Sequence, residues 1–158
     1  MSTKLTFEDF LADVAERQKA AVTKIHDDMT ASGYKHAVEK KASGALISYK
    51  HPKTKHSVFN LFFRKDGLQA RIYAENHRAY ADFIAALPDF IEAQVNKASQ
   101  CGRFMSPPKC SDKCMGYDIL INGNRYQKCR YSCFHLKADE KSLPIIVDLI
   151  EREKTARG

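Results

Sequence analysis

The sequence predicts an α+β fold in a single domain, with an antiparallel sheet packed against about three helices. The chain has 158 residues, which is the size of one ordinary domain. Apolar residues recur at helical spacing near both ends and in the middle of the chain, and strand-like runs with turn signals lie between these stretches. The expected order is one helix, three strands, a second helix, two strands and a third helix.

The first element is predicted to be one long helix over residues 7–31. Thr6 can act as its N-cap, with Asp9 three residues further on as a capping-box partner. Gly33 can end it, because glycine tolerates the backbone conformation that closes a helix. The positions at helical spacing, which we expect to face the core, are Phe7, Phe10, Leu11, Val14, Val22, Ile25 and Met29.

A β-meander is expected over residues 44–74. Pro52, which cannot donate a hydrogen bond, marks the first turn, and Asp66-Gly67 is a strong hairpin signal for the second turn. A further strand over residues 34–40 can precede the meander. The three principal strands are predicted at 44–49, 57–64 and 68–74.

The second helix is predicted over residues 78–98 and the last over 143–156. Pro88 should kink the second helix or start it afresh, because proline lacks an N–H and clashes with the preceding turn. Between these helices, residues 101–136 form a loop followed by a hairpin that reverses at Asn122-Gly123. Asn-Gly between strand-like runs is the strongest short-range hairpin signal, so we predict strands at 115–121 and 124–136.

Four of the five cysteines form two Cys-x3-Cys pairs around this hairpin: Cys110, Cys114, Cys129 and Cys133. A two-residue turn sets Ile121 opposite Asn124, and strand alternation then points three of these cysteines to one face. Four thiolates gathered in this way favour a bound metal, Zn²⁺ before others. A site with four thiolates has no open position for a substrate, so it would be structural.

Two alternatives stay open for the cysteines: packing as reduced, buried side chains, or forming a disulfide or redox pair. Cys101 could also replace Cys110 as a ligand. Residues four apart in a straight strand are ~13 Å apart, which is too far for two ligands of one ion. Cys129 and Cys133 can therefore share a metal only if the chain turns between them.

The net charge of +7 lies within residues 35–65, since the rest of the chain is balanced. Such a segment predicts either a polyanion-binding surface or a solvated strand face. Phe59, Phe62 and Phe63 are interleaved with its basic residues, and aromatic side chains on a basic sheet can stack exposed bases. Strand alternation puts Phe59 and Phe63 on one face and Phe62 on the other, and at least one of these faces must be core. The candidate polyanion-binding residues are Lys50, Lys53, Lys55, Arg64 and Lys65.

The chain carries none of the common phosphate-loop, nucleotide-binding, nucleophile-elbow or zinc-protease motifs. His135 follows Cys133 closely, but strand neighbours of this kind are more often coincidence than a catalytic pair. We therefore expect a non-catalytic binding module, with zinc bracing the hairpin and the basic meander meeting a polyanion such as nucleic acid. The alternatives are a small-molecule sensor and a thiol redox protein.

The first residues resemble no secretory signal, and no apolar run reaches the ~18–20 residues that a membrane helix needs. The sequence therefore predicts a cytoplasmic protein without a membrane partner. Thiols stay reduced in that compartment, which favours metal or redox chemistry over structural disulfides.

Overall fold

A computed structural model describes residues 4–102, 106–109 and 116–157, and it confirms the α+β fold. The strands are β1 (Lys35–Lys41), β2 (Gly44–Lys50), β3 (Ser57–Arg64), β4 (Gly67–Ile72), β5 (Tyr117–Ile121), β6 (Asn124–Lys128) and β7 (His135–Lys137). The helices are α1 (Phe7–Ala12), α2 (Lys19–Ala31), α3 (Ala81–Ala85), α4 (Asp89–Lys97) and α5 (Leu143–Arg157), with the 3-10 turns η1 (Glu16–Gln18) and η2 (His77–Tyr80).

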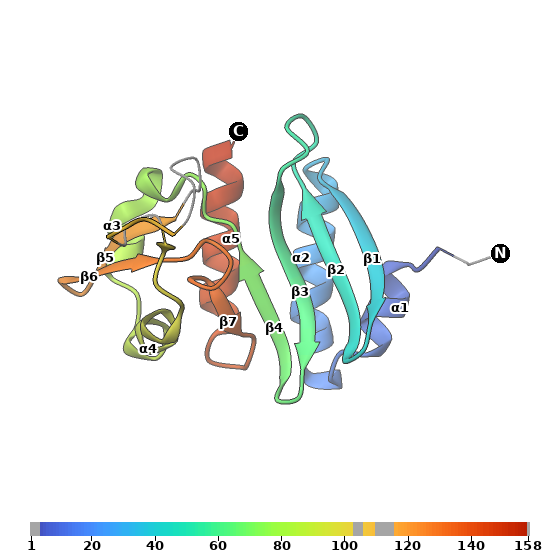
Figure 1. The fold of residues 1–158 in the computed structure, drawn as a ribbon. Helices are drawn as coiled ribbons and strands as arrows, with labels where there is room; N and C mark the ends of the chain where they lie inside the picture. The colour runs from blue at the N-terminus through green and yellow to red at the C-terminus, as the bar shows by residue number, and fades with distance from the viewer. Residues whose placement is uncertain (1–3, 103–105, 110–115, 158) are drawn as a thin grey trace.

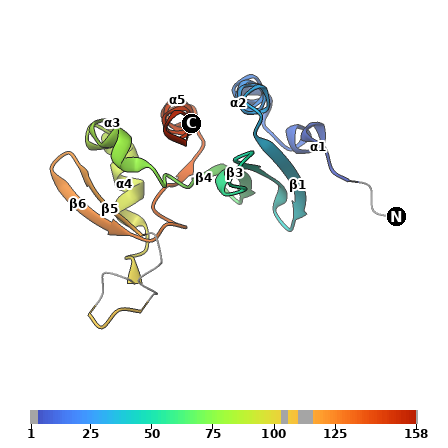
Figure 2. The ribbon, with the colours of Figure 1, turned by 90° about the horizontal axis from the view of Figure 1, so that it is seen from above.

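The strands form two antiparallel sheets. Five strands lie in the order β1-β2-β3-β4-β7, and β5 pairs with β6 as a separate hairpin. Helices α1, α2 and α5 lie on one face of the larger sheet, while α3, α4 and the hairpin lie beside its β7 edge (Figures 1 and 2). The larger sheet therefore has one face packed against helices and one face that none of the described helices covers.

The helix predicted over residues 7–31 is interrupted, which corrects the sequence-based expectation. The predicted capping box is present, with the Thr6 hydroxyl accepting from the Asp9 N–H and the Asp9 carboxylate accepting from the Thr6 N–H. Helix α1 nevertheless stops after Ala12, and the chain passes through η1 before α2 begins. The predicted apolar stripe has no member between Val14 and Val22, and the interruption instead buries Gln18 of η1, whose side-chain amide donates to the Ala138 carbonyl.

The meander has four strands, because the additional strand predicted over residues 34–40 is present as β1. The core lies under the side of the sheet that faces the helices, where Ile47, Leu61 and Ile72 are fully buried. A register shift in the pairing of β2 with β3 inserts Val58 as an extra residue, and it is also fully buried. This bulge turns two successive side chains toward the helices.

The second predicted helix, 78–98, is divided as Pro88 indicates. Helix α3 ends at Ala85, and Pro88 takes the N-cap position of a new helix, α4. The Asn122-Gly123 turn is also confirmed, since Ile121 pairs with Asn124 and both turn residues have positive φ.

The strand predicted over 124–136 is wrong beyond Lys128. The chain turns there, with the N–H groups of Ser132 and Cys133 donating to the carbonyl of Cys129 (3.1 and 2.9 Å). It then enters β7, which pairs with β4 in the larger sheet. Burial explains the switch, because Phe134 and Leu136 become fully buried in the common core. We call residues 129–134 the cysteine turn.

Candidate functional site

The face of the larger sheet opposite α1, α2 and α5, called here the open face, is strongly basic. Strand alternation and the observed register assign side chains to it. Its charged members include a single carboxylate, Glu39, and its cations come from all five strands. These cations are Lys35, Lys41, Lys50, Arg64, Arg71 and Lys137.

Phe62 lies on β3, the central strand of the larger sheet, and two arginine side chains lie over its ring on the open face. The guanidinium carbons of Arg64 and Arg71 lie 5.7 and 5.1 Å from its ring centroid. The ring of His135 approaches it edge-on, with the centroids 5.1 Å apart. These neighbours leave Phe62 only 9% exposed. Each arginine is therefore held against an aromatic ring, which limits the conformations that its guanidinium can take.

The positive charge of these two arginines is not neutralised within the described part of the chain. No carboxylate there lies within ion-pair distance of Arg64 or Arg71. The Nε of Arg71 is buried without a hydrogen-bond partner, as is the Oδ1 of Asn60, which lies opposite it on β3. Buried polar groups are usually satisfied, so an unpaired guanidinium nitrogen marks a place where an anion or water can bind.

Aromatic side chains and an arginine continue this line beyond β4. Tyr73 lies two residues after Arg71, and the guanidinium of Arg130 lies 5.1 Å from its ring centroid. The same guanidinium lies 5.5 Å from the ring of Tyr131, which is 55% exposed. The open face thus ends in an exposed aromatic ring next to a cation.

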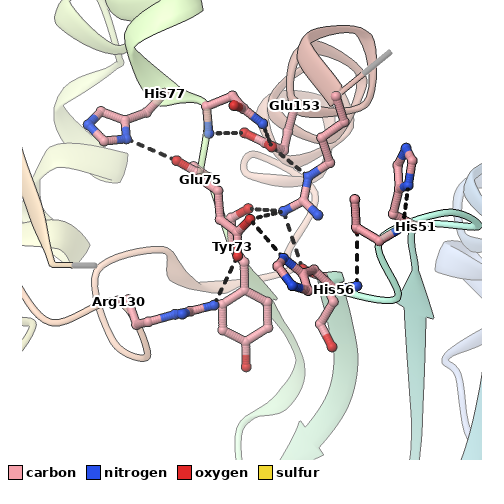
Figure 3. Close-up of polar contacts among 12 residues, drawn as sticks. His51, His56, Tyr73, Glu75, His77, Arg130 and Glu153 are labelled. Carbon is pink, nitrogen blue, oxygen red and sulfur yellow. Dashed lines mark hydrogen bonds and ion pairs between the residues drawn. The ribbon is translucent and has the colours of Figure 1, made fainter. Parts of the chain in front are cut away.

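A network of polar and charged side chains connects the segments at this end of the sheet (Figure 3). Glu75 follows β4, and its carboxylate accepts a hydrogen bond from Arg130 (3.2 Å). His56 and Arg157 both lie 3.7 Å from the other carboxylate oxygen. Arg130 is thereby tied to the sheet, so the cysteine turn that carries it has a defined position on the open face.

Behind Glu75, the carboxylate of Glu153 on α5 is completely buried. It accepts hydrogen bonds from the backbone and side-chain N–H groups of Asn76, from the Tyr80 hydroxyl and from Arg157 Nε, at 2.6 to 3.0 Å. Burial, and then the bond to Glu153, raises the pKa of Tyr80 above its usual range. This carboxylate joins the last helix to the segment that follows β4, so its role is structural.

The predicted polyanion-binding residues lie at two ends of the sheet. Lys53 and Lys55 lie in the exposed turn before β3, close in sequence to Lys50 at the end of β2. Arg64 and Lys65 lie at the other end of β3. Strand β3 has eight residues and spans ~26 Å, which separates the lysines at one end from Arg64 and Lys65 at the other. The five residues therefore do not form one local site.

Sequence reasoning missed the residues between these ends. Side-chain alternation along β4 could have placed Arg71 on the same face of the sheet as Phe62. No sequence signal placed Arg130 or His135 on the open face, because both residues reach it only through the unpredicted cysteine turn and β7.

Of the predicted zinc ligands, Cys110 and Cys114 lie outside the described residues. Cys129 is half-buried and Cys133 fully buried, and the turn between them meets the condition for sharing one ion. Within the described residues, no three His, Cys, Asp or Glu side chains are grouped as a metal site would require. Burial raises the pKa of the Cys133 thiol, which opposes its use as an activated thiolate.

Cys101, considered as a replacement ligand, lies next to this turn. Its N–H donates to the carbonyl of Gln127 (3.0 Å), and the Cys129 N–H donates to Ser99 (2.9 Å). Segment 99–101 thus runs antiparallel to the end of β6. Three cysteines therefore lie on neighbouring segments of the chain.

His135 should make folding sensitive to acid. Burial, and then the charges of Arg71 and Arg64, lower its pKa from 6.5 to about 4. An unfolded chain therefore binds a proton at this residue between pH 6.5 and 4 while the folded chain does not, so stability present above pH 6.5 is lost as the pH falls. We expect His135→Gln to lose less stability than the wild type between pH 7 and pH 5, measured by urea unfolding.

Burial and His36 also lower the pKa of His26, so the wild type and His135→Gln should both lose some stability in acid. The difference between the wild type and the variant removes this shared contribution. An identical pH dependence would contradict the assignment to His135.

Comparison of the chain with protein-family models, curated proteins and solved structures finds no significant match. None of the helices in the described parts of the chain is long and apolar enough to cross a membrane. The function must therefore be inferred from the site itself.

Proposed function

We propose that this protein binds single-stranded nucleic acid along the open face. The observation that carries the proposal is the pair of arginines, Arg64 and Arg71, which lie over Phe62 on that face and have no carboxylate partner among the described residues. Phosphate groups would pair with these guanidinium groups, which favour phosphate because of their planar, multiple donors. Lys35, Lys41 and Lys50 on the neighbouring strands would add non-specific attraction.

The shape of the face favours a single strand over a duplex. Five strands spaced by ~4.8 Å make a surface ~19 Å wide, whereas the major groove of B-DNA is ~12 Å wide. A single strand can instead lie across a sheet and expose its bases. The exposed ring of Tyr131 beside Arg130 offers a platform for stacking one of them.

Binding should weaken with salt, and replacing both central arginines should reduce that dependence. In fluorescence anisotropy with a labelled oligonucleotide, we expect Arg64→Gln/Arg71→Gln to lose at least tenfold in affinity. The slope of log K against log salt should fall by ~1.4, since each lost phosphate contact contributes ~0.7 for single strands.

The matched control is Arg17→Gln/Arg125→Gln, which removes the same charge from exposed positions on η1 and β6. It should bind within about twofold of the wild type at physiological salt, where distant exposed charges are screened. Equal losses in both double variants would show that only net charge matters. Absence of binding by the wild type at low salt would refute the proposal.

A structural zinc ion is a second proposal, supported by the reversal of the chain between Cys129 and Cys133. The ligands would be these two thiolates with Cys110 and Cys114, and a bound zinc would hold the cysteine turn against the preceding loop. Four thiolates would leave no position for a substrate.

Elemental analysis of the untagged protein, with a free-thiol count, tests this second proposal. We expect about one zinc per chain, and we expect Cys129→Ser to lower the melting temperature because structural zinc contributes folding free energy. Five reactive thiols without metal, or an unchanged melting temperature, would exclude the zinc site.

A further inference from the structure

A cavity of about 260 Å³ lies at the end of the open face, where the turn between β1 and β2 meets the hairpin between β3 and β4. Phe62 and Leu46 supply apolar lining. The Ser43 hydroxyl donates to the Phe63 carbonyl (2.6 Å), which ties the two turns together. The charged side chains that line it are Lys41, Arg64 and Arg71.

Two carboxylates near this cavity pair with lysines. Glu39 pairs with Lys41 (3.0 Å) at the exposed surface. Asp66 lies in the hairpin and turns toward Lys137 (3.0 Å) and Gln69 (3.2 Å). Among the described residues, no carboxylate lies within ion-pair distance of Arg64 or Arg71, and the buried Nε of Arg71 has no hydrogen-bond partner there. The cavity therefore suits an anion with more than one charged oxygen.

We propose that this cavity binds the terminal phosphate of a nucleic-acid strand, an inference that rests on the proposed function and specifies its ligand. A terminal phosphate carries a charge of about −1.5 to −2 at pH 7, whereas an internal phosphodiester carries −1. The two guanidinium groups of Arg64 and Arg71 complement the more highly charged group better. The cavity also lies at the opposite end of the open face from Tyr131, so a strand that stacks on that ring would end here.

Oligonucleotides of one sequence with a 5′-phosphate, a 3′-phosphate or only hydroxyl ends test the proposal. We expect one phosphorylated form to bind the wild type about tenfold more tightly than the hydroxyl form, as charge-assisted hydrogen bonds imply. Arg71→Gln should remove this preference. Lys41→Gln, at an exposed position where misfolding is not expected, should reduce it.

Lys137→Gln is the matched control, because Lys137 lies on the open face but does not line the cavity. It should weaken binding of all three oligonucleotides equally and keep the preference. Inorganic phosphate provides an independent probe. When it binds, the side-chain N–H resonances of Arg71, observed by NMR, should shift, because this guanidinium lines the cavity.

The outcomes separate the two proposals. Equal binding of all three oligonucleotides would overturn the terminal-phosphate inference and leave the binding of single strands intact. If inorganic phosphate shifts the Arg71 side-chain resonances but no oligonucleotide binds, the cavity is an anion site and the nucleic-acid function fails. Loss of the preference in Lys137→Gln would also overturn the assignment to this cavity.

Discussion

Glu153→Ala should lower the free energy of unfolding by about 3 kcal/mol, because it removes the closer partner of a buried ion pair and leaves Arg157 only its longer pair with Glu75 (3.7 Å). The Glu153 carboxylate is fully buried, and the Arg157 side chain that it pairs with is only 5% exposed. The substitution would also leave the Tyr80 hydroxyl and both Asn76 N–H groups without their acceptor. Urea unfolding followed by circular dichroism measures the loss.

Glu151→Ala is the matched control, since Glu151 lies on the same helix and pairs with Lys154 at 3.1 Å, but at a more exposed position. An exposed pair contributes roughly 0.2–1 kcal/mol, so this variant should stay close to the wild type. The double variant Glu153→Ala/Arg157→Ala should cost less than the two single changes added together. Equal stability of Glu151→Ala and Glu153→Ala would show that the buried network contributes little.

The fold could be predicted where local signals agreed with the packing. Asn122-Gly123 fixed the register of β5 with β6, and Pro88 marked the start of α4. The predictions failed where packing between distant segments decided the outcome. Nothing local in residues 124–136 ends a strand at Lys128, whereas in the structure the chain turns after Lys128 and Phe134 is buried in the core under the larger sheet.

The candidate site could be predicted only in part for the same reason. Net charge located the basic segment, and alternation indicated that Phe62 and Phe63 point to different faces. Arg71 and Arg130, however, acquire their positions from the pairing of β4 and from the cysteine turn. Composition cannot show that Arg130 pairs with Glu75 while Arg71 has no carboxylate partner in the described part of the chain.

Phe134→Ala should reduce stability and Tyr131→Ala should reduce affinity for a single strand, although both residues lie in the cysteine turn. Phe134 is fully buried, packs edge-on against Tyr117 with centroids 5.2 Å apart, and its carbonyl accepts from the Ile72 N–H. Truncating a buried phenylalanine costs about 3–5 kcal/mol, so this variant should unfold at much lower urea concentration. It should also release the hairpin from the larger sheet, which hydrogen exchange of β5 and β6 would detect.

Tyr131→Ala removes a ring that is already 55% exposed, so the free energy of unfolding should change by less than ~0.5 kcal/mol. Its affinity for a single-stranded oligonucleotide should fall by roughly tenfold, because stacking on one aromatic side chain contributes ~1–3 kcal/mol per base. Unchanged affinity would mean that Tyr131 only shields Arg130, and the strand would then contact the sheet through phosphates alone. A large loss of stability would instead mean that the Tyr73–Arg130–Tyr131 stack supports the turn itself.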